Sequence, residues 1–203
     1  MKAISKIESG KRMGFRFEIK KVIQEVGFLC RLSGNNRIDI MKLLKLLYLV
    51  DRESLKEAGY PITGDTHVAM KYGPVLSRVY DLAKGRPDWP YKNQDELVWG
   101  EHFKTECLYD LCLIKDPGED EMSPYEIELI KKIFDTYRHM SQFELRDLTH
   151  SFPEWIKNDP GESSKPIPLE DILDAVGLSE DKEEILDALS EEEYYDRFFA
   201  GKA

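Results

Sequence analysis

The sequence predicts a mainly α-helical fold of the α+β class: a compact helical domain with a small antiparallel β element, or wing. Apolar residues recur at helical spacing over residues 18–32 and 39–58, and two capping-box motifs open further helices in the second half. A segment rich in β-branched residues and glycine interrupts the helical pattern at residues 62–75. A chain of 203 residues is long enough to bury one substantial core.

The first two predicted helices differ in how much of their circumference is apolar. Residues 18–32 carry apolar side chains on one face, and a Ser-Gly-Asn-Asn run at residues 33–36 ends the pattern, because Gly and Asn adopt left-handed conformations at low cost. Residues 39–58 carry a broad apolar stripe that includes Leu47 and Tyr48. A helix this apolar is expected deep in the core.

The segment at residues 62–75 differs from its neighbours. Its β-branched residues, two glycines and a proline predict a short strand or wing between turns. Gly73-Pro74 predicts a turn, with Pro74 at the first position of a helix that runs to about Lys84.

Residues 96–115 fit two kinds of structure. Their leucines fit a helical face, whereas their Cys, Tyr and Val content fits one or two strands. We interpret the segment as strand, and we expect part of it to pair with residues 63–71 in the antiparallel β element.

Two capping boxes mark helices of the second half. Ser123 and Glu126 frame the start of one helix, and Ser141 and Glu144 frame the start of another that runs to about His150.

A loop rich in Gly, Ser and Pro at residues 158–168 is the predicted hinge. We expect residues 1–160 to form one domain and residues 161–203 to form an acidic helical extension that packs on the same core. The helices predicted in the extension span residues 169–176, 179–189 and 191–199, the last capped by Ser190. The residues expected to pack back on the core are Ile172, Leu173, Ile185 and Phe198.

Composition limits the partners and the compartment. The 39 acidic and 29 basic residues give a net charge of -10, which repels phosphate backbones and anionic lipids and favours a basic partner. Cys30, Cys107 and Cys112 form no CxxC pair, so we expect buried thiols in a reducing cytoplasm. The N-terminus lacks the apolar stretch of a signal peptide, and no segment is apolar and long enough to span a membrane.

The sequence contains no motif that indicates catalysis. It has no nucleophile elbow, no glycine-rich phosphate loop and no metal-ligand spacing, so we expect no enzymatic activity, no metal and no cofactor. An enzyme site assembled from dispersed residues is the weakest alternative. Its candidate residues are Asp51, His67, Lys71, Thr149 and His150. A stronger alternative is a DNA-binding transcriptional regulator whose winged-helix-like core spans residues 18–75.

Three segments resemble one known family. Residues 42–51 (KLLKLLYLVD) resemble the pattern KLxKLLYxAD, residues 59–75 resemble GxPITGxxYxAxxxGPV, and residues 145–155 resemble LxxxTHxxxxW. Val50 replaces the usual Ala, and His67 stands where Tyr is common. In this order and at this spacing, the segments resemble the Panacea family of SocA-like antitoxin domains, best over residues 39–155.

The resemblance implies the antitoxin of a type II toxin–antitoxin system, which neutralises a cognate toxin encoded nearby by binding it directly. A variant of this role is an adaptor that delivers the toxin to a Clp-type unfoldase and protease. The matched segments are expected to act as framework rather than as contact residues. The framework residues are Lys45, Tyr48, Asp51, Gly64, Gly73, Pro74, Thr149, His150 and Trp155.

We expect the toxin-binding surface on the wing and the loop that follows it. Aromatic and Arg anchors on irregular backbone are typical of interface hot spots, and loops tolerate sequence change. The predicted contact residues are Thr66, His67, Lys71, Tyr72, Arg78, Trp89 and Tyr91. The alternative is that Tyr72, Trp89 and Tyr91 cover the core.

Overall fold

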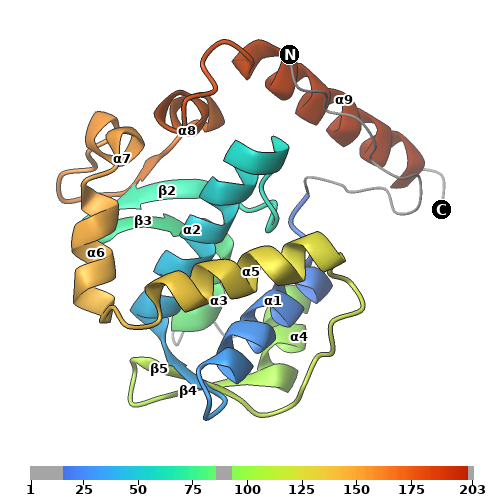
Figure 1. Cartoon of the computed structure of the whole chain (residues 1–203). Helices are drawn as coiled ribbons and strands as arrows, with labels where there is room; N and C mark the ends of the chain where they lie inside the picture. The colour runs from blue at the N-terminus through green and yellow to red at the C-terminus, as the bar shows by residue number, and fades with distance from the viewer. Residues whose placement is uncertain (1–15, 86–92, 201–203) are drawn as a thin grey trace.

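The computed structural model describes residues 16–85 and 93–200 and confirms a mainly α-helical fold with small antiparallel sheets (Figure 1). The helices are α1 (Ile19–Leu32), α2 (Ile40–Ala58), α3 (Ser77–Lys84), α4 (Gln94–His102), α5 (Pro124–Tyr137), α6 (Gln142–His150), α7 (Pro153–Lys157), α8 (Leu169–Ala175) and α9 (Lys182–Ala200). The strands are β1 (Arg37–Asp39), β2 (His67–Met70), β3 (Gly73–Leu76), β4 (Phe103–Glu106), β5 (Asp110–Leu113) and β6 (Lys165–Pro166). Within these ranges the strands form two antiparallel sheets, in the orders β1-β5-β4 and β3-β2-β6.

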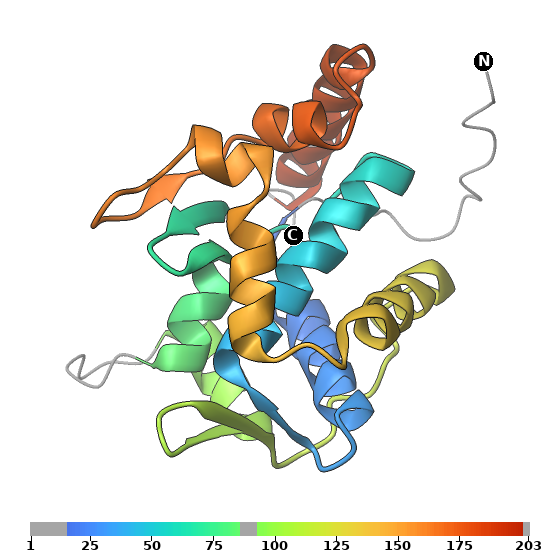
Figure 2. The same cartoon turned by 60° about the vertical axis from the view of Figure 1, so that its left-hand side comes forward.

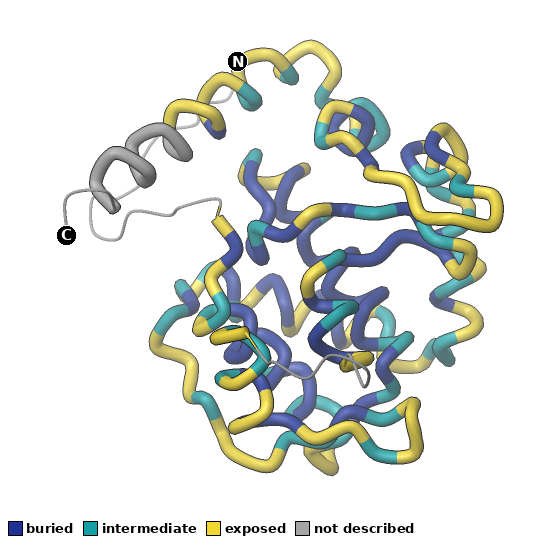
Figure 3. The backbone as a smooth tube through the Cα atoms, turned by 180° about the vertical axis from the view of Figure 1, so that it is seen from behind, coloured by how far each residue is buried: buried dark blue, intermediate teal, exposed yellow. Residues whose placement is uncertain are grey.

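Helix α2 runs through the centre of the molecule, with α5, α6 and β3 packed against it (Figures 1 and 2). The side chain of Asp39 caps its start by accepting a hydrogen bond from Lys42 N at 2.9 Å, and Gly59 ends it in the left-handed conformation, with φ 79°. Leu47 and Tyr48 are fully buried, which confirms α2 as the core helix. Figure 3 shows the buried residues concentrated in the interior of the body, whereas residues 182–191 of α9 are mostly exposed.

Both predicted capping boxes are present, at Ser123 and at Ser141. A third box, which the sequence analysis missed, opens α4. Asn93 Oδ1 accepts from Glu96 N and the Glu96 carboxylate accepts from Asn93 N, each at 2.9 Å. The strand prediction for residues 96–115 is therefore wrong in its first part, and β4 and β5 account for most of the rest.

The predicted pairing of residues 63–71 with part of 96–115 is wrong. β2 pairs with β3 across a tight turn, with Val68 opposite Val75, and with β6 on its other side. β5 pairs with β4 and β1. Each segment thus forms its own hairpin, because a short turn closes at a smaller entropic cost than a long connection.

Pro74 lies within β3, so its predicted position at the start of a helix is wrong. Helix α3 begins at Ser77, and its free N–H groups are capped from a distant loop. The Asp65 carboxylate accepts from Arg78 N at 2.9 Å and from Val79 N at 3.0 Å. A cap supplied from outside the helix leaves no local signal at the helix start.

The C-terminal region contains one long helix where two were predicted. Ser190 lies inside α9, so its predicted role as a cap is wrong. Ile172 and Leu173 are fully buried and Ile185 packs against the same cluster, as expected. The side chain of Phe198 lies outside the described residues.

The cysteine prediction is confirmed only in part. Cys30 is buried, Cys112 is half-buried and Cys107 is exposed at the β4–β5 turn, where hairpin closure places it in solvent. The expected burial is therefore wrong for Cys107. All three are free thiols within the described part of the chain. None of the described helices has the length and apolar character needed to cross a membrane.

Candidate functional site

The three sequence segments meet where α2, the β2–β3 hairpin and the α6–α7 pair pack together (Figure 2). Polar side chains are buried at this junction, each no more than 3% exposed. We call them the polar cluster: Lys45, Tyr48, Asp51, His67, Thr149 and Glu154.

Lys45 is a buried cation with no acidic partner among the described residues. Its Nζ donates a hydrogen bond to the carbonyl oxygen of Pro74 at 2.7 Å, and burial lowers the pKa of Lys45 to about 7. A Cβ on Gly73 would lie 2.7 Å from Lys45 Nζ and 2.9 Å from Thr149 Oγ1. Since Gly73 also has φ +91°, both space and conformation require glycine there.

Asp51 holds the loop between α2 and β2. Its Oδ1 accepts hydrogen bonds from Ile62 N at 2.8 Å and from Thr63 N at 2.9 Å, and the Thr63 hydroxyl donates to Oδ2. Nε2 of His67 lies 3.3 Å from the same Oδ2. A buried carboxylate with these partners organises a turn that has no regular backbone pairing of its own.

Tyr48 and Glu154 link α2 to α7. The Tyr48 hydroxyl donates to Glu154 Oε1 at 3.1 Å, and Arg52 Nε donates to the same oxygen at 2.7 Å. The Arg52 guanidinium also lies 4.3 Å from the centroid of the Phe152 ring. Burial and the Glu154 carboxylate raise the pKa of Tyr48, so its hydroxyl stays protonated at neutral pH.

His150 and Trp155 lie at the outer side of the polar cluster, with Thr149 fully buried beside them. The rings of His150 and Trp155 stack with centroids 4.2 Å apart, and Trp155 Nε1 donates to Met70 O at 3.3 Å. Burial and the charge of Lys45 lower the pKa of His150, so its ring is neutral at pH 7. Its Nε2 is buried and finds no hydrogen-bond partner in the described part of the chain.

Two members of this junction, Arg52 and Glu154, are not predicted from the sequence. Both are adjacent to predicted framework residues, since Arg52 follows Asp51 and Glu154 precedes Trp155. The sequence gives no sign that Arg52 and Glu154 form an ion pair, because their contact depends on how α2 and α7 pack.

Asp51 and His67 lie together in the polar cluster, and both are almost completely buried. A groove of about 350 Å³ reaches His67, but its lining includes neither Lys45 nor Thr149. Lys71 lies apart, exposed on the hairpin turn. Over the described ranges, no group of three or more His, Cys, Asp or Glu side chains is placed to hold a metal ion. The arrangement fits a framework that positions β2, β3, α6 and α7.

Four of the predicted contact residues are exposed: Thr66, Lys71, Tyr72 and Arg78. They lie on the loop before β2, on the β2–β3 turn and at the start of α3. Lys71 forms an ion pair with Glu162 at 2.9 Å.

The other predicted contact residues have different positions. His67 is only 3% exposed, because it packs edge-on to Tyr48, with ring centroids 5.7 Å apart. Trp89 and Tyr91 lie outside the described residues.

Comparison with protein families matches residues 43–156 to the family described as Antitoxin SocA-like, Panacea domain. The match covers more than half of the chain. The chain belongs to the Panacea family. No curated protein and no solved structure matches it. The Panacea match contains the whole polar cluster and ends at Ile156, so that β6, α8 and α9 lie beyond it.

Helix α2, the second helix of the predicted winged-helix core, is not of the kind that reads DNA. Recognition of bases needs an exposed helix face with polar side chains. In α2 only Lys56, Glu57 and Ala58, at its C-terminal end, are exposed. The packing of α2 therefore does not favour the DNA-binding alternative.

Proposed function

We propose that this protein is the antitoxin of a type II toxin–antitoxin system and that it neutralises a toxin by binding it directly in the cytoplasm. The observation that carries the proposal is membership of the Panacea family over residues 43–156. The toxin is expected to be encoded beside the antitoxin.

The distribution of polar residues supports a binding role. Side chains of the polar cluster make internal hydrogen bonds, such as those of Asp51 and Glu154. These hydrogen bonds stabilise the arrangement of the β2–β3 hairpin and of α6 and α7. The exposed residues Tyr72 and Arg78 are of the types enriched in interface hot spots. We place the contact surface on Thr66, Lys71, Tyr72 and Arg78, with Trp89 and Tyr91 completing it.

A growth assay combined with co-purification tests the proposed function. The protein encoded by the adjacent open reading frame is expressed with and without this chain, and the two are then purified through a tag on one of them. We expect the adjacent protein to arrest growth, this chain to restore it, and the two to co-purify. Lys104→Ala, an exposed change away from the proposed surface, is the folded control. Restored growth without a complex would contradict direct binding.

The lifetime of the toxin separates sequestration from delivery to a protease. If the chain acts as an adaptor for a Clp-type protease, the half-life of the toxin should fall when the chain is present and recover in cells that lack the protease. If the chain sequesters the toxin, the half-life should stay the same or rise.

A further inference from the structure

The extension beyond the Panacea match has the densest negative charge of the chain. Residues 161–203 contain 13 Asp and Glu against four Lys and Arg, a net charge of -9 over 43 residues. The matched residues 43–156 contain 21 against 14, a net charge of -7 over 114 residues, and residues 1–42 contain four against ten. A basic partner therefore meets the densest negative charge at the extension.

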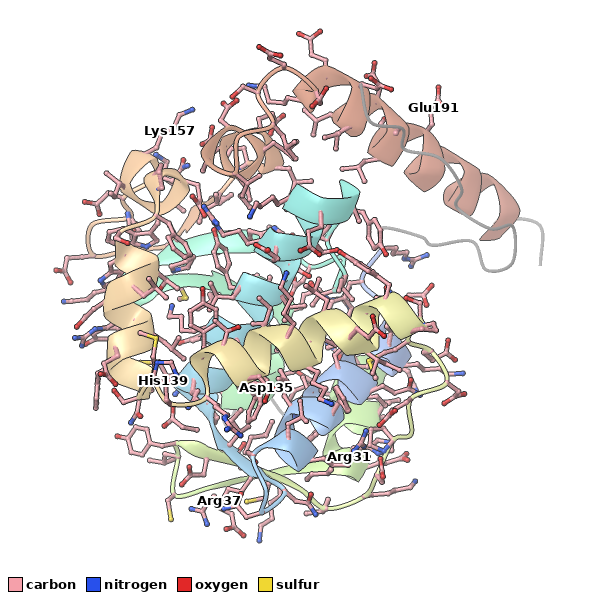
Figure 4. The ribbon with its side chains drawn as sticks, viewed as in Figure 1. Arg31, Arg37, Asp135, His139, Lys157 and Glu191 are labelled. Carbon is pink, nitrogen blue, oxygen red and sulfur yellow. The ribbon has the colours of Figure 1, made fainter. Side chains whose placement is uncertain are left out.

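The acidic residues of α8 and α9 differ in how they are used. Asp171 accepts hydrogen bonds from Lys157 and Asn158, and Asp174 pairs with Lys182 at 2.8 Å. These carboxylates hold α8 in place. The acidic residues further along α9 are exposed and form no ion pair with any described residue: Glu183, Glu184, Asp187 and Glu191. Figure 4 shows Glu191 projecting outward from α9.

A groove of about 350 Å³ lies between α9 and the loop that leads into β2, a volume in the range of ligand-sized clefts, about 300–1,000 Å³. We call it the α9 groove. Its lining is mostly apolar and includes Pro61, Ile167, Leu169, Leu186 and Leu189; its polar residues are Asp65, Thr66, His67 and Ser190. One wall comes from the matched Panacea domain and the other from the extension beyond it.

Helical geometry places the free acidic residues along this groove. Leu186 and Ser190 line it and are four residues apart, so they share one face of α9. Glu183, Asp187 and Glu191 have the same spacing and form the adjoining stripe. The α9 groove therefore has an apolar floor and an acidic rim.

We propose that the α9 groove binds a Lys- and Arg-rich amphipathic segment of the toxin, an inference that rests on the proposed function. Apolar side chains of the segment fill the floor, and its cations meet the acidic stripe of α9. A second copy of this chain would bring like charges together at the rim, and nucleic acid would be repelled. A basic amphipathic peptide is the chemistry that fits both parts of the groove.

Two double variants test the position of the charge at equal net charge. Glu183→Lys with Asp187→Lys reverses the rim, and Glu128→Lys with Asp135→Lys reverses two exposed residues of α5. Ser190→Trp fills the groove from its exposed edge without altering charge. The probes are the toxin and a labelled synthetic helix of Leu and Lys, each titrated at low and at moderate salt.

We expect the rim variant to weaken binding of both probes at least about tenfold at low salt, and the α5 variant to change it less than about twofold. Ser190→Trp should also weaken the binding of both probes. If the two double variants lost equal affinity for the probes, binding would depend on the net charge of the protein and not on the rim of the α9 groove, and the proposal would be overturned. A dimer of this chain that is lost in the rim variant would overturn it in favour of a second copy.

The two proposals fail in different ways. If the chain neutralises and binds the toxin while the rim and Ser190→Trp variants bind it normally, the groove proposal is wrong and the antitoxin function stands. If the peptide binds in the groove but the chain neutralises no toxin, the antitoxin function is wrong.

Discussion

The Panacea domain and the C-terminal extension place their charged and polar residues in opposite ways. In the domain, Lys45, Asp51 and Glu154 are buried, and their hydrogen bonds connect elements that lie far apart in the sequence. In the extension, acidic residues such as Glu183 and Asp187 are exposed along one side of α9. The buried charged residues of the match thus make internal hydrogen bonds, whereas acidic residues of the extension face solvent.

The largest expected effect comes from the core of the domain. Leu47→Ala should lower the free energy of unfolding by roughly 2–5 kcal/mol, because Leu47 is fully buried on the central helix and the change leaves a cavity. Chemical denaturation measures this loss. A loss below about 0.5 kcal/mol, the range of surface substitutions, would show that α2 is not the centre of the core.

Lys45 should make stability depend on pH. Its pKa is about 7 in the folded protein and higher in the unfolded chain, so the unfolded state holds more protons between about pH 7 and 10.5. The contribution of Lys45 to stability therefore rises with pH across that window, and below it the folded state carries a fixed penalty. Lys45→Met should remove the rise and stabilise the protein at pH 6 by on the order of 1–4 kcal/mol, offset by the hydrogen bond lost at Pro74 O. A variant with the same pH profile as the original protein would show that Lys45 is not buried.

Glu25 should have the opposite pH dependence. It is fully buried on α1, neither carboxylate oxygen has a hydrogen-bond partner among the described residues, and burial raises its pKa well above 4.5. The folded state therefore holds the extra proton, and the contribution of Glu25 to stability falls as pH rises above about 4.5. Glu25→Gln should be more stable than the original protein at pH 8 and nearly equal to it at pH 4. Denaturation at both values measures the difference, and a variant that is less stable at pH 8 would contradict it.

The smallest effect on stability is expected at the proposed contact surface. Lys71→Ala and Tyr72→Ala should leave the midpoint of thermal unfolding unchanged, because both residues are exposed on the β2–β3 turn. The same variants should weaken toxin binding in a titration. If both bind the toxin as tightly as the original chain, the contact surface lies elsewhere, and the α9 groove becomes the principal candidate.

The sequence predicted the features that depend on local patterns. The apolar stripe of α2 and the capping boxes at Ser123 and Ser141 are each contained in one segment, so their prediction was sound. The box at Asn93 is of the same kind and was missed because the Cys, Tyr and Val content of the segment after it favoured strand. A capping signal at Asn93 thus predicts the start of α4 better than the composition of the residues that follow.

Sequence patterns do not predict the features that depend on how the helices and strands pack. Strand partners were assigned wrongly because alternation in a segment identifies a strand but not its neighbour. The burial of Lys45 and the pairing of Arg52 with Glu154 follow from how α2 meets β3 and α7. The resemblance implies that Lys45, Asp51 and Thr149 are framework residues, and all three are buried in the structure.

Inhibition of the purified toxin by the purified chain tests the central claim most directly, because no protease or other cellular factor is present. Direct binding predicts that toxin activity falls in proportion to added chain and is abolished near the stoichiometry of the complex, with Leu47→Ala less effective at temperatures where it unfolds. Full toxin activity in the presence of excess folded chain would contradict the claim.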